Sequence, residues 1–328
     1  MKKLLFIIIA SASCFCSIQM HAAFTFLPLR DTTIAPGDHT RTLNFGGLKR
    51  SYIIHIPAHV MGLGKLPVVL VFHGGGSNAI DWEKFCGFNE TAEKNNFIVV
   101  YPNGTGRIKG YEDKVLGWNG GPHEPGGDHP DLQKIDDVGF TRALLDDLSA
   151  VLPVDKKRVY ATGMSMGAIM VYRLGSELSD RIAAIATIAG SMGTDSCRPI
   201  RAVSVMDFHG TEDPGVPFEG GKGKIDPSGA IYYSAEFSVQ SWVKADGCNK
   251  IPTIDTLPAV VNDSTVVVRK KYTAGKNGAE IIQYVIIGGG HTWPGIPPGP
   301  GMEILGRTTK SIQANDLIWE FFKKHPMQ

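Results

Sequence analysis

The sequence predicts an α/β protein with a mostly parallel central sheet flanked by helices. Short apolar runs rich in β-branched residues recur along the chain, as expected of strands that are buried on both faces. These runs lie at residues 66–72, 97–101, 158–162, 183–189, 203–208 and 281–287. Apolar residues at helical spacing separate or follow them, for example at 144–152 and 314–322. The alternation of the two patterns favours βαβ units and therefore a parallel sheet.

An antiparallel hairpin is expected at the N-terminal edge of this sheet. Residues 41–45 and 51–56 have strand character and are joined through Gly46 and Gly47, and mixed sheets commonly carry such an edge. The 328 residues are 43% hydrophobic and 20% charged, which is typical of a soluble globular protein. We expect residues 23–328 to form a single domain, as α/β folds of this length commonly do. A formal net charge of +1 gives no electrostatic support for a nucleic-acid partner.

The first 22 residues have the features of a signal peptide. Lys2 and Lys3 precede the apolar stretch 4–12, and the small-residue cleavage pattern is Met20-His21-Ala22. The apolar run is shorter than the roughly 20 residues that a membrane-spanning helix needs. We therefore expect export to the periplasm or the extracellular space, without stable membrane association after the signal is removed. Lipid attachment at Cys14 is a weaker alternative, because Ser11 occupies a position that normally holds a large aliphatic residue.

Three cysteines, Cys86, Cys197 and Cys248, remain after the predicted signal peptide. An oxidising compartment would allow a disulfide to persist, and three thiols cannot all pair. A bridge between Cys197 and Cys248 is one alternative. The other is that the thiols stay free and buried, as small hydrophobic groups.

The pentapeptide at residues 163–167, GMSMG, has the form G-x-S-x-G. It follows the predicted strand 158–162 and precedes a helical run at 168–178. This context is that of a nucleophile elbow, where a tight turn between strand and helix projects a serine from the edge of the sheet. Small neighbours are needed so that the turn can close and the helix can pack. The pattern predicts Ser165 as a nucleophile; the alternative is an ordinary glycine turn.

The segment HGGG at residues 73–76 follows the apolar strand 66–72 directly. Such a segment is typical of an oxyanion hole, in which backbone N–H groups face a reacting carbonyl oxygen. We expect the donors to be the N–H of Gly74 and that of Met166, the residue after the serine. His73 itself is expected to be structural. The alternative is a flexible glycine loop.

A hydroxyl nucleophile needs a base and a carboxylate that orients the base. Asp213 follows the strand 203–208 and His291 follows the strand 281–287, so that both lie beyond the carboxyl ends of strands, where α/β sheets place their sites. Ser165, Asp213 and His291 would then be nucleophile, acid and base. Glu212 is an alternative acid. Asp207 is expected to be a satisfied polar residue within a strand, and His209 to brace a loop.

The residues that carry this chemistry resemble a known group of enzymes. HGGG at 73–76, GMSMG at 163–167, HGTEDP at 209–214 and GGGHTWPG at 288–295 are similar to segments of the poly(3-hydroxybutyrate) depolymerase and feruloyl esterase group of carbohydrate esterase family 1. The resemblance extends over about residues 44–323 and implies an α/β-hydrolase fold with Ser165, His291 and Asp213 as the catalytic residues. It also suggests Trp118 and Trp293 as walls of the acyl or sugar pocket, with core packing as the alternative for both.

The chain departs from this group after Asn119. Residues 120–131, GGPHEPGGDHPD, stand where many relatives carry a paired-cysteine segment, so that the shape of the loop 104–130 is not implied by the resemblance. The candidate ligands His123, Glu124, Asp128, His129 and Asp131 lack the helical histidine spacing of a zinc protease. We expect neither a metal nor a cofactor. The loops 104–130 and 294–301 are expected to border the substrate cleft.

The sequence as a whole predicts an exported serine carboxylesterase that acts on a small-molecule or oligomeric ester. Esters of hydroxyalkanoate oligomers or polyesters and feruloyl or acetyl esters of plant polysaccharide are the expected substrate classes, as the resemblance implies. An acyltransferase that passes the acyl group to a sugar is one alternative. A non-catalytic secreted binding protein of the same fold is the other.

Overall fold

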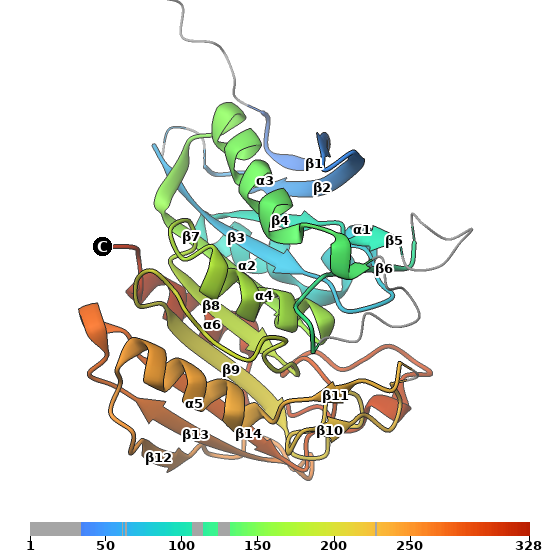
Figure 1. The fold of residues 1–328 in the computed structure, drawn as a ribbon, viewed down its shortest axis with the longest axis vertical. Helices are drawn as coiled ribbons and strands as arrows, with labels where there is room; N and C mark the ends of the chain where they lie inside the picture. Colours follow the sequence, from blue (N-terminus) through green and yellow to red (C-terminus); the bar gives the residue numbers. More distant parts are fainter. Residues whose placement is uncertain (1–33, 61, 63, 107–113, 124–131, 227) are drawn as a thin grey trace, which may run out of the picture. The chain divides into compact units, whose positions relative to one another are not determined.

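A ten-stranded mixed sheet forms the centre of the computed structural model (Figure 1). The structure describes residues 34–328 except 61, 63, 107–113, 124–131 and 227, and the part from Ile34 onward is one compact unit. The predicted signal peptide, residues 1–22, and most of the candidate ligands in 120–131 lie outside the described residues. In spatial order the strands are β1 (Gly37–Phe45), β2 (Leu48–Ile56), β4 (Ile98–Pro102), β3 (Leu66–Phe72), β7 (Val154–Met164), β8 (Ala184–Ile188), β9 (Ser204–Gly210), β14 (Ile281–Ile287), β13 (Val266–Tyr272) and β12 (Thr253–Thr256).

The strands from β4 to β14 in this order are parallel to one another. Their side chains are buried at nearly every position, and β3, β4, β8 and β9 are buried throughout, as expected when helices cover both faces of a parallel sheet. The hairpin of β1 and β2 pairs antiparallel with β4. The predicted fold class, a mostly parallel sheet with an antiparallel N-terminal edge, is confirmed.

The other edge of the sheet differs from the prediction. Strands β13 and β12 add a second antiparallel pair beside β14, and neither strand is anticipated by the apolar pattern. The physical reason is that β13 carries Arg269, Lys270 and Lys271 in its middle. These side chains are partly exposed, by 38%, 26% and 39% respectively, and Arg269 forms an ion pair with Asp255 on β12. A strand beside the edge strand that carries partly exposed charges does not produce the apolar run of a central strand.

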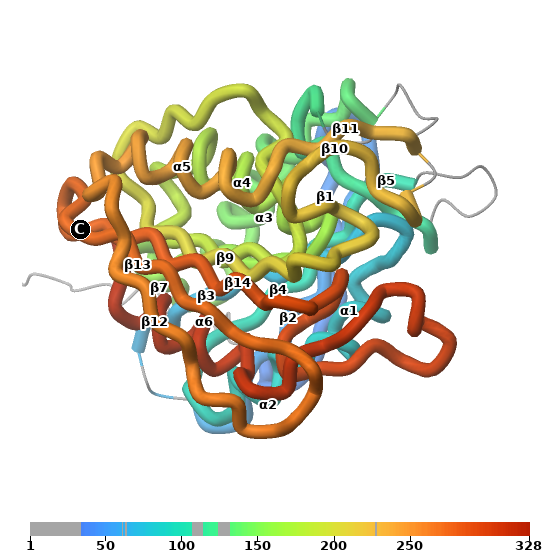
Figure 2. Tube along the Cα trace, turned by 90° about the horizontal axis from the view of Figure 1, so that it is seen from below, coloured from blue at the N-terminus to red at the C-terminus, as the bar shows by residue number. Residues whose placement is uncertain are grey.

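In the described part of the chain, helices α1 to α6 cover the two faces of the sheet (Figure 2). Helices α3 (Asp137–Val151), α4 (Met166–Glu177) and α5 (Ala235–Asp246) pack on one face, against side chains such as Val68 and Leu70. Helices α1 (Ala79–Cys86), α2 (Phe88–Asn95) and α6 (Ala314–Lys324) pack on the other, against Val69 and Val71. Two small ribbons, β5 (Thr105–Gly106) with β6 (Leu116–Gly117) and β10 (Gly221–Lys222) with β11 (Ile231–Tyr232), lie outside the sheet.

This arrangement brings four loops together at the carboxyl ends of the parallel strands. The HGGG segment follows β3, the serine follows β7, Asp213 follows β9 and His291 follows β14. Because these strands are parallel, all four loops leave from the same end. The fold therefore places the predicted catalytic residues close enough in space to share one site.

Candidate active site

Ser165 occupies a sharp turn between β7 and α4. Its backbone has φ 59° and ψ −127°, a region that residues other than glycine rarely adopt, and such strain is typical of functional turns. The N–H of Ser165 donates to the carbonyl of Ile188 at 2.9 Å, which fixes the turn against β8. A Cβ on Gly163 would lie 2.8 Å from the carbonyl oxygen of Phe72, and one on Gly167 would overlap the same oxygen. Both glycines are therefore required for the elbow to pack against β3.

Asp213 and His291 form the buried acid–base pair of this site. The Nδ1 atom of His291 lies 2.8 Å from Oδ2 and 3.0 Å from Oδ1 of Asp213. The N–H groups of Gly215 and Val216 also donate to Oδ1 of Asp213, at 2.7 and 2.8 Å. Since a carboxylate only accepts, Nδ1 of His291 carries the proton of this hydrogen bond. The other ring nitrogen, Nε2, is then an acceptor, as a general base must be.

Close packing of two glycine turns brings this pair together. A Cβ on Gly210, at the end of β9, would overlap the carbonyl of Gly289, which follows β14. The N–H of Glu212 donates to the carbonyl of Gly289 at 2.8 Å. The N–H of His291 in turn donates to the carbonyl of Leu305 at 2.7 Å. The turns that carry Asp213 and His291 are thus held by backbone contacts, independently of the contact between the two side chains.

Glu212, the alternative acid, faces away from the histidine. Its carboxylate is 63% exposed and forms an ion pair with Arg307. Asp213, in contrast, is 6% exposed and contacts the imidazole directly. Asp207 is fully buried within β9 and accepts hydrogen bonds from Tyr172, Thr187 and Gln283. The structure therefore makes Asp213 the carboxylate partner of His291.

Ser165 and His291 line the same cavity. Among the contacts of the described residues, their side chains do not share a hydrogen bond, and Ser165 Oγ donates to no protein acceptor. Catalytic hydrogen bonds are often long in free enzymes and shorten in the substrate complex. The arrangement therefore offers the residue types of an acyl-transfer site, with the predicted nucleophile and the predicted base around one cavity.

The pKa values of the pair are shifted in opposite directions. Burial raises the pKa of the Asp213 carboxyl, but the charge and the hydrogen bond of His291 outweigh burial, so that the net pKa is lowered. Burial likewise lowers the pKa of His291, and the neighbouring Asp213 carboxylate raises it by more, so that the net pKa lies above the ordinary value of 6.5. Each group stabilises the charged form of the other.

This shift predicts the pH dependence of the activity. Protonation of His291 removes the lone pair that would accept the proton of Ser165. Since the pKa of His291 is raised, kcat/KM for ester hydrolysis should fall as the pH decreases through a midpoint above 6.5, and should be constant at higher pH. A rate profile from pH 5 to 9 with a soluble p-nitrophenyl ester measures that midpoint. A midpoint clearly below 6 would contradict the coupling of His291 to Asp213.

The candidate oxyanion donors lie beside the serine. A Cβ built on Gly74 would lie 3.5 Å from the Cβ of Ser165. Within the described part of the chain, the N–H groups of Gly74 and Gly75 donate to no protein acceptor, although both residues line the cavity. Met166 is the first residue of α4, and the first N–H groups of a helix have no partner within the helix. These free N–H groups can stabilise a negative oxygen.

The cavity in front of Ser165 has a volume of about 470 Å³ and a largely apolar wall. Trp82 and Phe85 of α1 line it together with Trp293, and their rings contact one another edge-on or tilted. Pro298, Pro300, Met302 and Leu305 also line the cavity. The predicted loop 294–301 thus borders the cavity.

The two predicted pocket tryptophans differ in position. Trp293 stands among the residues around the cavity, but its side chain is fully buried against Trp82 and Phe85, and its Nε1 donates to Asn315 Oδ1 at 2.9 Å. Trp118 is fully buried, contacts Phe72 and His73, and does not line the cavity. Trp118 therefore packs in the core, which is one of the two alternatives that the sequence leaves open for it.

Sequence reasoning missed Trp82 and Phe85. They lie three positions apart on α1, and residues at this spacing share one helix face. The helix begins soon after the HGGG segment, with Asn78 as its N-cap. Two aromatic residues on one face of the first helix after an oxyanion loop would have been the pattern to notice.

One group of potential metal ligands lies elsewhere. Oxygen and nitrogen atoms of Asp38, His55 and Glu83 lie within 4.8 Å of one another. Both ring nitrogens of His55 already contact carboxylates, Nδ1 that of Asp38 and Nε2 that of Glu93. Glu83 accepts a hydrogen bond from Asn89, so protein partners already engage these side chains, and none of them lines the cavity of Ser165.

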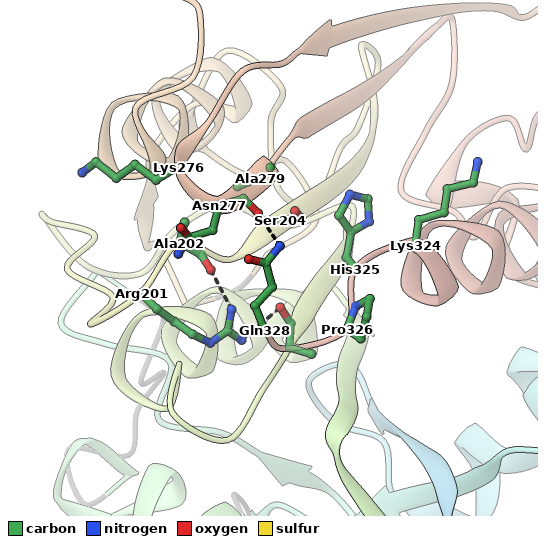
Figure 3. Close-up of a pocket in the computed structure, with 12 residues that line it drawn as sticks. Arg201, Ala202, Ser204, Lys276, Asn277, Ala279, Lys324, His325, Pro326 and Gln328 are labelled. Carbon is green, nitrogen blue, oxygen red and sulfur yellow. Dashed lines mark hydrogen bonds between the residues drawn. The ribbon is translucent and has the colours of Figure 1, made fainter.

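A second cavity of about 350 Å³ lies at the opposite, amino end of the strands, beside the start of β9 (Figure 3). The guanidinium of Arg201 donates there to backbone carbonyls, among them those of Ser179 and Ala183. Lys276 and Lys324 extend away from each other (Figure 3). Gln328 donates to the carbonyl of Asn277. Arg201 and Gln328 thus bind backbone carbonyls here, and the predicted catalytic residues lie at the other end of the sheet.

Cys86, Cys197 and Cys248 are all free thiols. Cys86 is buried beside Tyr101, and Cys248 is buried beside the carbonyl of Ala279. Burial raises the pKa of all three thiols, that of Cys86 to about 12. The structure thus follows the free-thiol alternative rather than a bridge between Cys197 and Cys248.

Comparison with known proteins identifies the family. Residues 50–220 match the family model described as Esterase PHB depolymerase, which is more than half of the chain. The chain belongs to this family. The predicted resemblance to poly(3-hydroxybutyrate) depolymerases and feruloyl esterases is confirmed, and so is the prediction of a serine ester hydrolase with an α/β-hydrolase fold.

Individual relatives agree with this family. The chain is 29% identical to "Putative esterase NocK" of Nocardia uniformis subsp. tsuyamanensis, over 90% of this chain and 86% of that protein. It is also 29% identical to feruloyl esterase B of Piromyces equi, over 74% of this chain, and spans 42% of that longer protein. The solved structure of an acetyl xylan esterase from Aspergillus awamori shares the fold, with a TM-score of 0.54 and 13% identity over 87% of this chain and 99% of the other. No helix in the described ranges is long and apolar enough to span a bilayer.

Proposed function

We propose that this esterase hydrolyses carboxylic esters by a serine mechanism in which Ser165 is the nucleophile, His291 the base and Asp213 the acid. The observation that carries the proposal is the contact of His291 Nδ1 with Asp213, on the wall of the cavity that also exposes Ser165. Ser165 Oγ attacks the ester carbonyl carbon and its proton passes to His291 Nε2. The imidazolium then protonates the leaving alcohol. In the second half of the reaction water is the nucleophile: its proton passes to His291 Nε2, it attacks the acyl group, and the imidazolium returns a proton to Ser165 Oγ as the acid is released.

The negative oxygen of each tetrahedral intermediate needs hydrogen-bond donors in place before the reaction. We assign this role to the N–H groups of Gly74 and Met166, as the sequence predicts. Their support is that Gly74 lies against Ser165 and that its N–H faces no protein acceptor among the described residues. A positively polarised helix N-terminus behind Met166 adds to the stabilisation.

The apolar cavity supports a substrate whose acyl group is larger than acetyl. Trp82 and Phe85 offer ring surface that an acetyl group would leave uncovered, and the buried ring of Trp293 packs against both. A feruloyl group or a 3-hydroxybutyrate oligomer covers more of it, and each buried CH₂ contributes about 0.8 kcal/mol. We therefore propose hydroxyalkanoate or feruloyl esters as substrates. The similarity to a feruloyl esterase and the family description support this range. The features of residues 1–22 support export.

A substrate panel tests this proposal. We expect release of ferulate from a feruloyl saccharide, or of 3-hydroxybutyrate from its oligomers, with a kcat/KM at least tenfold above that for the matching acetyl ester, since about 1.4 kcal/mol of extra contact corresponds to tenfold. Liquid chromatography of the released acids measures all three on one enzyme preparation. A preference for acetyl esters would refute the assigned acyl cavity. Failure on all three, together with no fluorophosphonate labelling of Ser165, would refute the serine esterase itself.

A further inference from the structure

Two consecutive peptide groups beside Ser165 are held only from their carbonyl sides. They join His73 to Gly74 and Gly74 to Gly75. The carbonyl of His73 accepts a hydrogen bond from Trp118 Nε1 at 3.0 Å, and the carbonyl of Gly74 accepts one from His73 Nδ1 at 2.8 Å. The N–H sides of both groups, on Gly74 and Gly75, have no protein acceptor among the described residues. In a trans peptide the C=O and N–H bonds point in opposite directions, so fixing one fixes the other.

The indole of Trp118 is itself firmly placed. It is fully buried, meets Phe72 edge-on and lies against the ring of His73. Its chain segment is tied to the glycine loop, because the N–H of Gly76 donates to the carbonyl of Leu116 at 2.8 Å and the N–H of Leu116 donates to the carbonyl of Ser77 at 3.1 Å. Backbone hydrogen bonds therefore connect the segment of Trp118 to the loop whose carbonyl its indole holds.

The imidazole of His73 holds the next carbonyl of the loop, that of Gly74. Its Nε2 accepts the N–H of Gly104 at 3.0 Å, so its proton lies on Nδ1, where it can reach the carbonyl of Gly74. Burial lowers the pKa of His73 to about 4. The ring is therefore neutral and keeps this single tautomer throughout the working pH range. His73 thus holds the second peptide group together with the N–H of Ser77, which donates to the same carbonyl at 3.2 Å, whereas the carbonyl of His73 is held by Trp118.

The hydrogen bond of Trp118 is not an automatic result of burial. In the part of the chain that the structure describes, the Nε1 atoms of the buried residues Trp82, Trp242 and Trp319 have no acceptor. Trp118 has one, and it is the carbonyl whose peptide group carries the N–H of Gly74. A purely space-filling ring would not need this partner.

We propose that Trp118 is a positioning residue for ester hydrolysis: its indole N–H holds the carbonyl of His73 and thereby aims the N–H of Gly74 at the reacting carbonyl oxygen. This role rests on the proposed function, because it needs an oxyanion at that place. A small error in the direction of a preorganised donor is costly, since the loss of one such donor lowers kcat about 10²- to 10³-fold. Misdirection of a donor that remains present should cost less, roughly tenfold.

The experiment compares Trp118→Phe with the matched control Trp242→Phe. Both residues are fully buried tryptophans of the same core cluster, and only the first loses a hydrogen bond. For each variant, kcat and KM are measured with a p-nitrophenyl ester, the inhibition constant with phenylboronic acid, and the unfolding midpoint by thermal melting. The boronic acid adds to Ser165 Oγ as a tetrahedral adduct with an oxygen in the oxyanion position.

We expect Trp118→Phe to lower kcat about tenfold with KM changed less than twofold, and to raise the inhibition constant of the boronic acid by the same factor as kcat/KM falls. Trp242→Phe should change neither quantity by more than twofold, whatever its effect on the melting temperature. If the two variants lose activity equally, or if boronate inhibition of Trp118→Phe equals that of the wild type, the positioning role is refuted.

Two further measurements keep the result interpretable. If Trp118→Phe does not fold, benzothienylalanine at residue 118 replaces the N–H by sulfur in a ring of the same shape, and the same losses are expected. Boronate inhibition of the wild type, and its disappearance in Ser165→Ala, tests the serine mechanism separately. Intact boronate binding with unchanged Trp118→Phe kinetics would refute the inference alone, whereas no boronate binding to the wild type would refute the proposed function.

Discussion

Replacement of Ser165 by alanine is expected to lower kcat for ester hydrolysis by a factor on the order of 10⁵ to 10⁶ while the protein stays folded. The factor follows from removal of a nucleophile in other serine hydrolases. The turn does not depend on the hydroxyl, since the backbone N–H of residue 165 donates to Ile188 and the side chain makes no cap for α4. Rates with a p-nitrophenyl ester and circular dichroism spectra measure the two expectations.

Ser191→Ala is the matched control for this variant. Ser191 is fully buried and, within the described residues, its Oγ has no hydrogen-bond partner; it does not line the cavity. This control should retain activity within about twofold, as substitutions without such features usually have small effects. Ester hydrolysis by Ser165→Ala at more than one hundredth of the wild-type rate, by a preparation free of other esterases, would contradict the nucleophilic role.

Replacement of Asp213 by asparagine is expected to lower kcat about 10⁴-fold. The N–H groups of Gly215 and Val216 both point at Oδ1, so the amide oxygen of the substituted side chain must take that place and its NH₂ group must face His291 Nδ1. Nδ1 then becomes an acceptor and the proton moves to Nε2. In this tautomer His291 cannot accept the proton of Ser165. Initial rates on the same ester measure the loss.

Glu212→Gln provides the contrast for Asp213→Asn. The two acids are adjacent in the chain, but Glu212 is exposed and pairs with Arg307, and such surface pairs contribute about 0–1 kcal/mol to stability. We expect the activity of Glu212→Gln to stay within twofold of the wild type. Comparable losses in both variants would mean that the carboxylate assignment is wrong.

The aromatic wall of the cavity shows where motif reasoning stops. A motif reports residues whose chemistry and spacing are constrained, such as Ser165 within GMSMG. Trp82 and Phe85 belong to an ordinary short helix, and only the packing of α1 beside the segment 298–305 turns their rings into the wall of a cavity. Trp118 is the opposite case, because the family resemblance suggests it as a pocket residue, with core packing as the alternative, and the core encloses it completely.

Local patterns in the chain are sufficient to predict the strands of the parallel core, the N-terminal hairpin and the elbow around Ser165. Apolar runs and glycine turns are local properties, and β3 and β14 have the bounds that their composition predicts. Packing alone establishes which acid faces His291, that β12 and β13 close the second edge, and that Trp118 holds the carbonyl of His73. These features depend on the direction of side chains from segments far apart in the chain, and direction is fixed only when the segments pack together.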